Sequence, residues 1–389
     1  MARVTPPLVL KVGGSCLLDL DDVERVAEWL RRRLGADGAA VVVVSALAGT
    51  TAALDAALRR LNHDPPPRIT AGVLLHGDEL CAGLLAAALA ARGVDAEVAA
   101  GRHTGLVATG RPDRARLVRV DPAPLLAALG RARVAVVPGG QAVDAAGRPV
   151  MLGRNSADTS AVAAAVAVGA VRCDIFSAVS GIFTADPHLV ADARPVATLG
   201  YAAAGAMTRA GAKVLHPEAV GLAERHGVAV TCRGWPPVAG GGTVVAGDGG
   251  VDAVVTASAS RVWAAPAGGT RPAGVDGAVV VDEGGVAHLA LPCGDEVEVP
   301  AGLDPRPALR LLTVIRGDAP VERRLVPVGR LAAVAADRHR ALHAAGRGRI
   351  PVDSGPRLPT GTAWNGRAEP SSGASTPGRT PTAWPAASP

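Results

Sequence analysis

Aromatic side chains are nearly absent from this sequence. Phe, Trp and Tyr together make up 2% of the 389 residues. A platform of aromatic rings on which nucleic-acid bases stack is therefore not expected. The hydrophobic content is nevertheless 49%, so the chain can bury a large core built from Ala, Val and Leu.

Several chemical motifs are also missing. No Gly-x4-Gly-Lys-Ser/Thr P-loop appears, and no Gly-x-Gly-x-x-Gly follows a predicted strand, which argues against P-loop NTPases and dinucleotide enzymes. No Cys-x-x-Cys pair occurs, so neither a disulfide framework nor a zinc site is predicted, and a reduced compartment is favoured. The cysteines are dispersed, at Cys16, Cys81, Cys173, Cys232 and Cys293.

Hydropathy and charge do not indicate a membrane or nucleic-acid partner. Residues 1–12 lack the apolar run of a signal peptide. The longest apolar run, residues 161–171, is well short of the ~20 residues that a bilayer span needs. The net charge of +5 and the pI near 9.3 suit phosphate ligands, while the arginines are scattered. We expect a soluble, cytoplasmic protein with a small-molecule substrate and neither nucleic acid nor membrane as partner.

Short apolar runs alternate with amphipathic segments through the first 245 residues. Alternating strands and helices predict an α/β fold, a three-layer α/β/α sandwich around a mostly parallel sheet. The predicted strands are residues 8–12, 41–44, 94–99, 134–137, 173–179 and 228–232. The predicted helices are residues 21–34, 52–61, 79–92, 158–168, 201–210 and 217–226.

The composition changes after a Gly-rich break near residue 240. We predict a catalytic domain over residues 1–245 and a small α+β domain over residues 246–346. The latter has strand-like runs at 251–256, 278–281, 287–291 and 311–315 and a helix at 328–345. Residues 347–389 are rich in Pro, Ser, Gly and Thr, and we predict that they form a disordered tail.

Lys11-Val12-Gly13-Gly14 ends the first predicted strand and begins a turn toward a helix. Adjacent glycines let backbone N–H groups approach phosphate oxygens, and a lysine there can neutralise charge on a phosphoryl group. Taken alone, the segment is also typical of an ordinary tight turn.

Two later segments bring further charged groups. Asp158 begins an Ala-rich helix, which it can cap, and the planar guanidinium of Arg154 can bind a carboxylate through two oxygens. Lys213 is either a helix-end cation or a phosphate ligand. We interpret His216 as structural, because phosphoryl transfer to an ionised carboxylate needs no general base.

Polar groups also follow the second predicted strand. Ser45 and Thr51 place hydroxyls on either side of a glycine hinge, and Asp78 precedes a helix of small residues. Asp78 is interpreted equally well as a helix cap or as a ligand for an ammonium group.

These segments, taken in order over residues 8–245, resemble the amino-acid kinase superfamily and, within it, the aspartate kinases. Their ordered co-occurrence is far more specific than any single motif. The segments are Lys11-Val12-Gly13-Gly14, Val44-Ser45-Ala46, Gly77-Asp78, Pro138-Gly139-Gly140, Leu152-Gly153-Arg154 with Asp158-Thr159, Thr184-Ala185-Asp186-Pro187 and Gly211-Ala212-Lys213-Val214-Leu215-His216-Pro217.

The resemblance implies ATP-dependent phosphorylation of the β-carboxylate of L-aspartate to 4-phospho-L-aspartate, the first step of an amino-acid biosynthetic pathway. It also implies Mg²⁺ on the phosphates and suggests a homodimer. The implied catalytic residues are Lys11, Asp158 and Lys213. The implied substrate-binding residues are Ser45, Thr51, Asp78 and Arg154. The implied nucleotide-binding residues are Lys11, Gly13, Gly14, Ser177, Phe183, Asp186 and Lys213.

The sequence departs from the family pattern at several places, of which the change to Ser15-Cys16 after the glycine pair is mild. Asn155-Ser156-Ala157 replaces Gly-Gly-Ser, where side chains obstruct a close backbone approach. Ala178, Ser180 and His188 replace two carboxylates and an arginine around the expected nucleotide pocket. Asp78 replaces a glutamate that receives the substrate amine.

These departures leave three interpretations. The first is an aspartate kinase. The second is an enzyme of the same fold that phosphorylates another carboxylate or a phosphate. The third is a catalytically weak homologue that serves as a ligand-binding or regulatory subunit. The paired regulatory ACT domains of aspartate kinases are not recognisable in residues 246–346, which resemble at most a degenerate ACT-like domain.

Overall fold

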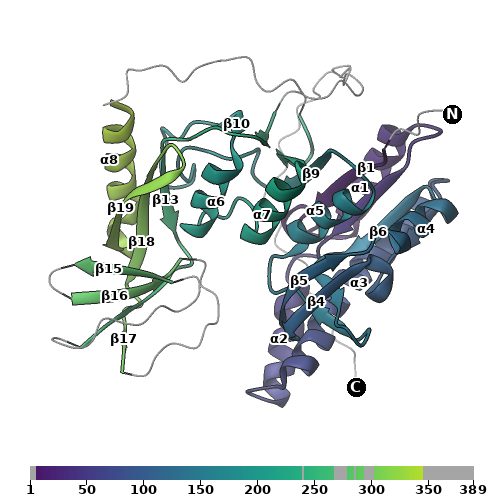
Figure 1. The fold of residues 1–389 in the computed structure, drawn as a ribbon, viewed down its shortest axis with the longest axis horizontal. Helices are drawn as coiled ribbons and strands as arrows, with labels where there is room; N and C mark the ends of the chain where they lie inside the picture. Colours follow the sequence, from purple (N-terminus) through teal and green to yellow (C-terminus); the bar gives the residue numbers. More distant parts are fainter. Residues whose placement is uncertain (1–5, 239–240, 267–277, 284–285, 293–301, 345–389) are drawn as a thin grey trace.

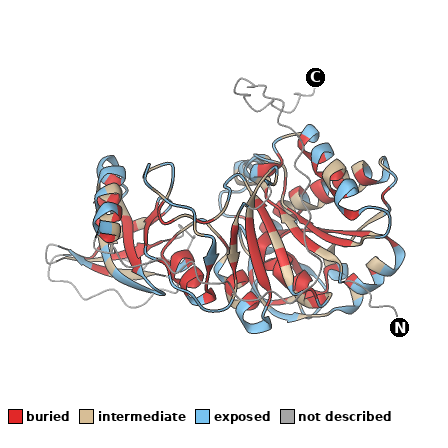
Figure 2. Ribbon diagram, turned by 90° about the horizontal axis from the view of Figure 1, so that it is seen from above, coloured by how far each residue is buried: buried red, intermediate tan, exposed pale blue. Residues whose placement is uncertain are grey.

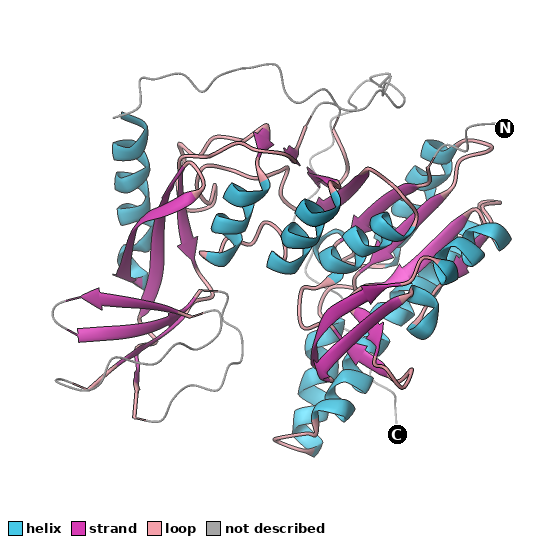
Figure 3. Ribbon diagram, viewed as in Figure 1, coloured by secondary structure: helices cyan, strands magenta, loops and turns pink. Residues whose placement is uncertain are grey.

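The computed structural model describes residues 6–238, 241–266, 278–283, 286–292 and 302–344. Its larger part is a sheet with helices on both faces, which confirms the predicted α/β sandwich (Figure 3). Within the described residues this sheet has eight strands in the order β10-β12-β11-β9-β1-β2-β6-β3. Their bounds are β1 (Leu8–Val12), β2 (Ala40–Val44), β3 (Ala96–Val98), β6 (Val134–Pro138), β9 (Arg172–Ser177), β10 (Thr198–Leu199), β11 (Ala229–Gly234) and β12 (Thr243–Val245).

Strand β1 lies at the centre of the sheet and pairs in parallel with β2 and β9. Lys11 is opposite Val43 on one side and Ile175 on the other. The parallel pairs β2–β6 and β9–β11 extend the sheet, so the carboxyl ends of all five strands share one edge. Because β1 is the strand from which the order runs in both directions, this edge is the switch point at which open α/β sheets bind ligands.

The sheet is buried on both faces because its strands carry apolar residues at successive positions. Val9, Val41 and Val43 pack toward α5–α7, whereas Leu10 and Val42 pack toward α1 and α3. Figure 2 shows buried strands between helices whose outer surfaces are exposed. The helices of this part are α1 (Leu20–Leu34), α2 (Thr50–Leu61), α3 (Pro67–Ala90), α4 (Ala123–Arg131), α5 (Ala157–Ala167), α6 (Tyr201–Arg209) and α7 (Pro217–His226).

Helix α5 is buried along nearly its whole circumference. Its sequence ADTSAVAAAVA has no side chain larger than valine, so the helix packs closely on β1, β2 and β9 and against α7. Protein interiors are close-packed, and a larger residue here would require the sheet or α7 to move. The small residues therefore hold the first turn of α5 close to the end of β1.

Helix α3 begins twelve positions before the predicted start at residue 79, so that prediction was wrong. Pro67 occupies its first turn, where a missing N–H is tolerated, and the helix runs on through Gly72 and Gly77. By length and composition, α3 is the one described helix apolar enough to cross a membrane. In the structure it packs against α1, α2 and β6 and contributes Leu85 and Leu89 to the core.

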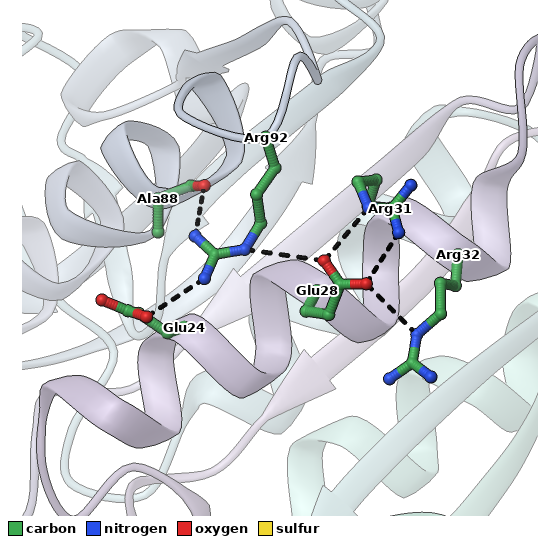
Figure 4. Close-up of polar contacts among 6 residues, drawn as sticks. All are labelled: Glu24, Glu28, Arg31, Arg32, Ala88 and Arg92. Carbon is green, nitrogen blue, oxygen red and sulfur yellow. Dashed lines mark hydrogen bonds and ion pairs between the residues drawn. The ribbon is translucent and has the colours of Figure 1, made fainter.

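Ion pairs join the outer surface of α1 to Arg92, just after the end of α3 (Figure 4). Arg92 reaches Glu24 at 3.1 Å and Glu28 at 3.7 Å, while Arg31 and Arg32 also pair with Glu28. Pairs exposed to solvent contribute roughly 0–1 kcal/mol each, so this network adds little to stability.

Three of the few aromatic residues meet where α1 crosses the ends of β9 and β11. Trp29, Phe176 and Trp235 form mutual edge-to-face contacts with ring centroids 5.5–5.6 Å apart. Such pairs add about 0.5–1.5 kcal/mol beyond their burial. This cluster fastens α1 beside the glycine turn that follows β1.

A second, four-stranded sheet was not predicted. Its order is β5-β4-β7-β8. Strand β5 carries three arginines in its seven residues, RARLVRV, so the run lacked an apolar strand signal. Its strands are β4 (Leu106–Arg111), β5 (Arg114–Val120), β7 (Gln141–Val143) and β8 (Pro149–Met151). Strand β8 leads directly into the turn before α5.

Where it is described, the C-terminal part has two antiparallel sheets and one α-helix (Figure 1). The four strands and the helix expected there are present, whereas three strands, at residues 261–264, 304–305 and 319–327, were not predicted. The tail predicted over residues 347–389 lies outside the described residues. One sheet consists of β13 (Ala253–Ala257), β18 (Leu309–Arg316) and β19 (Ala319–Pro327), and the helix is α8 (Leu331–Ala344). The other consists of β14 (Arg261–Ala264), β15 (Val279–Glu283), β16 (Val286–Leu291) and β17 (Asp304–Pro305).

Candidate active site

A buried ion pair lies at the carboxyl end of β1. The Nζ atom of Lys11 is 2.9 Å from Oδ1 of Asp158, and both side chains are nearly nine-tenths buried. Lys11 comes from the central strand and Asp158 from the first turn of α5. The structure therefore brings together two of the three predicted catalytic residues.

The glycine turn after β1 makes room for the Lys11 ammonium group. A Cβ atom at Gly13 would lie 3.1 Å from Nζ of Lys11, and one at Gly14 would lie 2.9 Å from the carbonyl oxygen of Ala46. The N–H of Gly13 donates to the carbonyl of Phe176 at 3.1 Å and so continues the sheet. This corrects the expectation that both glycines offer N–H groups to phosphate: of the two, only Gly14 is left for that role.

The second oxygen of Asp158 links the ion pair to the turn that carries Lys213. Oδ2 accepts a hydrogen bond from the backbone N–H of His216 at 3.1 Å. The His216 ring caps α7, because its Nδ1 accepts the N–H of Glu218 at 3.3 Å, with Thr159 Oγ1 at 3.2 Å. This capping role agrees with the structural interpretation of His216.

Lys213 lies in the turn between α6 and α7, three positions before His216, and is exposed. It makes no hydrogen bond or ion pair within the described residues. Its ammonium group is therefore available to a ligand. Lys11 and Lys213 are the only lysines among the 40 Lys and Arg residues of the chain.

A carboxyl group lies on the other side of the glycine turn. Oδ1 of Asp78, on α3, accepts the N–H of Ala46 at 3.0 Å. Gly77 allows this approach, since a Cβ there would lie 3.1 Å from that of Ala46. Ser45 and Thr51 flank the same loop, at the end of β2 and in the first turn of α2.

Burial raises the pKa of Asp78 to about 7, although the Ala46 N–H and the charge of Lys11 act in the opposite direction. A buried carboxyl group with a pKa near neutrality is ionised most readily when a cation binds beside it. Asp78 thus has the properties expected of a ligand for a substrate ammonium group.

The turn from β8 to α5 presents Arg154 to solvent. Gly153 has φ 91° and Asn155 has φ 62°, and Asn155 is the one non-glycine residue with positive φ in the described chain. Asparagine is among the few L-residues that adopt this conformation readily, so it serves in place of the glycine of the family pattern. Arg154 makes no ion pair or hydrogen bond within the part of the chain that is described.

Ser156 and Ala157 do not obstruct this turn. Ser156 is buried, and its Oγ donates to the carbonyl of Gly153 at 2.7 Å. Gly139 and Gly140 supply the space, because Cβ atoms there would lie 2.6 Å from the Ala157 Cβ and 2.8 Å from the Ser156 Oγ. The larger residues of the turn are matched by glycines on the β6–β7 connection.

The predicted nucleotide residues lie on the segment that follows β9. Ser177 Oγ donates to the carbonyl of Val179, and the half-buried Phe183 forms a bridge with Pro195. Oδ1 of Asp186 accepts the N–H of His188 at 2.9 Å. The placement of this segment beside the lysines as a nucleotide pocket stays a prediction.

Several contacts at the site had no counterpart in the sequence analysis. The N–H groups of Ala46 and His216 hold the two carboxylates, and backbone donors leave no residue-type signal. Ser15 Oγ, which accepts the N–H of Ala178 at 3.2 Å, joins the glycine turn to the end of β9. In the sequence, this contact is indicated only by the polar residue type of Ser15 beside the Gly-Gly pair.

The described cysteines play no part in this chemistry. Cys16, Cys81, Cys173 and Cys232 are free and buried. Burial raises the pKa of each thiol, which keeps the groups neutral and unreactive.

The fold is a mostly parallel α/β sheet with a buried lysine–carboxylate pair and a glycine turn at its switch point, and a hydrogen bond links this pair to the turn that carries an exposed lysine. A family model described as the amino acid kinase family matches residues 6–234. The chain therefore belongs to the amino acid kinase family.

Aspartokinases are among its relatives. The chain is 36% identical over 226 residues to an aspartokinase of Thermus thermophilus, covering 58% of this chain and 56% of the relative. It is 37% identical over 227 residues to one of Mycolicibacterium smegmatis, covering 58% and 54%. The chain thus spans about half the length of the curated relatives it matches.

Solved structures confirm the fold. E. coli aspartokinase III in complex with aspartate and ADP, in the R-state, superposes with a TM-score of 0.68 at 20% identity, over 86% of this chain and 99% of that one. The same enzyme with lysine and aspartate, in the T-state, gives a TM-score of 0.62 at 21% identity.

Proposed function

We propose that the chain is an aspartate kinase, which transfers the γ-phosphoryl group of ATP to the β-carboxylate of L-aspartate and forms 4-phospho-L-aspartate and ADP. The observation that carries the proposal is the Lys11–Asp158 pair at the end of β1, tied through His216 to the turn of Lys213. The identity to aspartokinases of two genera over the same region supports the choice of acceptor.

The lysines act on the charge of the transferring group. Phosphoryl transfer needs little covalent chemistry from the protein, so positioning and electrostatic stabilisation account for most of the catalysis. Asp158 holds the Lys11 ammonium group beside the glycine turn. Lys213 supplies a second positive charge from the turn whose His216 N–H bonds to Asp158.

The acceptor side uses Asp78 and Arg154. Asp78 binds the α-ammonium group of aspartate, and the guanidinium of Arg154 binds its α-carboxylate through two oxygens. Ser45 and Thr51 offer hydroxyl groups between them. The β-carboxylate is ionised at neutral pH, so it attacks phosphorus directly and no protein base is required.

The residues at the end of β1 fit the triphosphate group of a nucleoside triphosphate. Two ammonium groups, the Gly14 N–H and a turn that a Cβ atom would fill match a polyphosphate. Magnesium in kinases is bound largely by substrate phosphates, and it would neutralise part of their charge. Ser177, Phe183 and Asp186 are proposed to contact the rest of the nucleotide.

An acceptor panel tests the choice of substrate. Release of ADP by the full chain with Mg²⁺ and ATP is measured with L-aspartate, L-glutamate, D-aspartate or no acceptor. We expect turnover with L-aspartate to exceed the others by at least about tenfold, because the two ends of the substrate are held at a fixed spacing. Equal or higher turnover with L-glutamate would assign the site to a longer acceptor.

The Arg154→Ala variant tests the carboxylate contact in the same assay. We expect the KM for L-aspartate to rise about 10- to 100-fold, with the KM for ATP unchanged, since a charge-assisted contact is lost. Arg148→Ala is the matched control, because Arg148 is exposed and, among the residues that the structure describes, its side chain pairs with Asp144 alone. An unchanged aspartate KM in the Arg154 variant would remove this residue from the acceptor site.

A further inference from the structure

The chain between β9 and β10 folds back on itself as a loop over residues 182–196. The N–H of Thr184 donates to the carbonyl of Arg194, and the N–H of Val196 donates to that of Ile182, both at 2.9 Å. The loop carries Phe183 and Asp186, two residues that we propose to contact the nucleotide. Its conformation therefore bears directly on that contact.

Helix α8 of the C-terminal part contacts this loop through a buried histidine. Nε2 of His339 is 2.9 Å from Oγ1 of Thr184, and the two residues are 2% and 6% exposed. The same Oγ1 accepts the N–H of Arg194 at 2.9 Å. Thr184 is thus the point at which the two ends of the loop and α8 meet.

Strand β13 and an apolar cluster add to this attachment. The N–H of Val254 donates to the carbonyl of Thr184 at 2.8 Å. Ala185 and Val190 of the loop are buried in one cluster with residues of β13, β18, β19 and α8. The residues on both sides of Asp186 are therefore fixed by the C-terminal part, whereas Asp186 itself is only half-buried.

We propose that His339 is a positioning residue for ATP: by holding Thr184, it fixes the 182–196 loop in the conformation that binds the nucleotide. The inference rests on the proposed function, because it takes ATP as the ligand. It makes nucleotide affinity a property of α8, which contributes no group to the lysine–aspartate site.

The hydrogen bond depends on the protonation of His339. With Nε2 unprotonated, the Thr184 hydroxyl donates to the ring while it accepts from Arg194. A protonated ring would donate instead, and the hydroxyl would have to find another acceptor. Burial lowers the pKa of His339, and the nearby His343 and Arg194 lower it further, while Asp192 raises it. The pKa of His343 is also lowered, by burial and by Arg194, against the effect of Asp252. The neutral ring is therefore the form expected at neutral pH.

Calorimetric titration of the full chain with Mg²⁺ and ATP, without aspartate, tests the proposal. We expect His339→Ala to raise the Kd for ATP about five- to tenfold, because a buried hydroxyl loses its partner and the loop loses its anchor. His339→Gln, whose amide reaches to the position of Nε2, should return the Kd to within about twofold of the unaltered chain. In turnover assays, His339→Ala should raise the KM for ATP by the same factor and leave that for L-aspartate unchanged.

His343→Ala is the matched control. His343 packs against His339 with ring centroids 4.4 Å apart and ring planes tilted by 59°, and its Nε2 has no partner among the described residues. This variant removes the same ring from the same helix without removing the bond to Thr184, so its Kd should stay within about twofold. Equal effects of the two alanine variants, or no effect of either, would overturn the proposal.

Thr184→Val provides a second route if His339→Ala unfolds, which circular dichroism will show. It removes the hydroxyl at nearly constant shape, so we expect the same rise in Kd, and an unchanged Kd would overturn the proposal.

Failure of the proposed function and failure of the role of His339 give different results. A chain that binds ATP but does not phosphorylate aspartate contradicts the proposed function alone, whereas normal ATP affinity in His339→Ala contradicts this inference alone.

Discussion

Lysine occurs at two positions in this chain, and both are at the proposed phosphoryl-transfer site. Every other basic side chain except histidine is an arginine. Lysine carries a compact charge that approaches phosphate oxygens as a point, whereas the arginine guanidinium is planar and wider. Lysine at positions 11 and 213 therefore suits close approach to the oxygens of the transferring phosphoryl group.

Replacement of Lys213 by arginine retains the positive charge and tests whether a compact ammonium group is required there. We expect Lys213→Arg to lower kcat about 100-fold, because the wider group cannot occupy the same position in the transition state. The KM for L-aspartate should change little. Arg209→Lys, one turn earlier on α6, is the matched control and should leave kcat near its normal value; a fully active Lys213→Arg would show that charge alone suffices.

Asp78 predicts a pH dependence of acceptor binding. Its pKa in the free protein is about 7, so it is neutral below that pH and cannot attract the substrate ammonium group. We expect the KM for L-aspartate to be flat above about pH 7.5 and to rise toward tenfold per pH unit below about 7. The substrate itself keeps its charges over this range.

Asp78→Asn is the variant that identifies the titrating group. It should give a high KM for L-aspartate that no longer changes between pH 5.5 and 8, whereas the KM for ATP follows the unaltered chain. A pH-dependent KM that survives this substitution would assign the titration to a different residue.

Among the elements, the turn between β8 and α5 determines where Arg154 and Asp158 lie. It combines two residues of positive φ with the glycines of the β6–β7 connection. Asn155 adopts there a positive φ, a conformation that glycine adopts at no steric cost. The departures from that pattern at Ser156 and Ala157 are accommodated by packing.

Asn155→Val should destabilise the protein by ~1–2 kcal/mol, because a β-branched residue is strained at φ 62°. Asn155→Gly should be close to neutral. Asn62→Val is the control, since Asn62 has φ −146°, a conformation that valine adopts readily, and it loses only one exposed hydrogen bond, from the N–H of Asp64. Chemical denaturation measures all three, and equal stability of the two valine variants would contradict the account of the turn.

For the whole molecule, elements with a dense local signal were predictable from the sequence. The bounds of β1 and α7 are those expected, since an apolar run and a Pro-to-Gly helix pattern mark their ends. The strand β5 was missed because arginines interrupt its hydrophobicity, and the start of α3 was missed because glycines obscure its period. Local sequence patterns thus predict most strands of the main sheet, but not the second sheet or the start of α3.

The candidate site divides in the same way. Lys11, Asp158 and Lys213 follow from motif order, and the structure places the first two in contact. The N–H groups that hold the carboxylates, and the bond between Thr184 and a histidine 155 positions away, depend on tertiary contacts. One departure from the family pattern, His188, lies on the 182–196 loop that α8 contacts, so part of the proposed nucleotide pocket depends on residues outside the family match. A boundary near residue 245 and homodimerisation stay predictions.

Trapping of the product with hydroxylamine tests the central claim most directly. The purified full chain is incubated with Mg²⁺, ATP, L-aspartate and hydroxylamine, and aspartyl hydroxamate is quantified beside a folded Lys213→Ala variant. We predict time-dependent hydroxamate formation that requires both ATP and aspartate, and a loss of at least about 100-fold in the variant. Absence of hydroxamate from the unaltered chain, or equal amounts from the variant, would contradict the account.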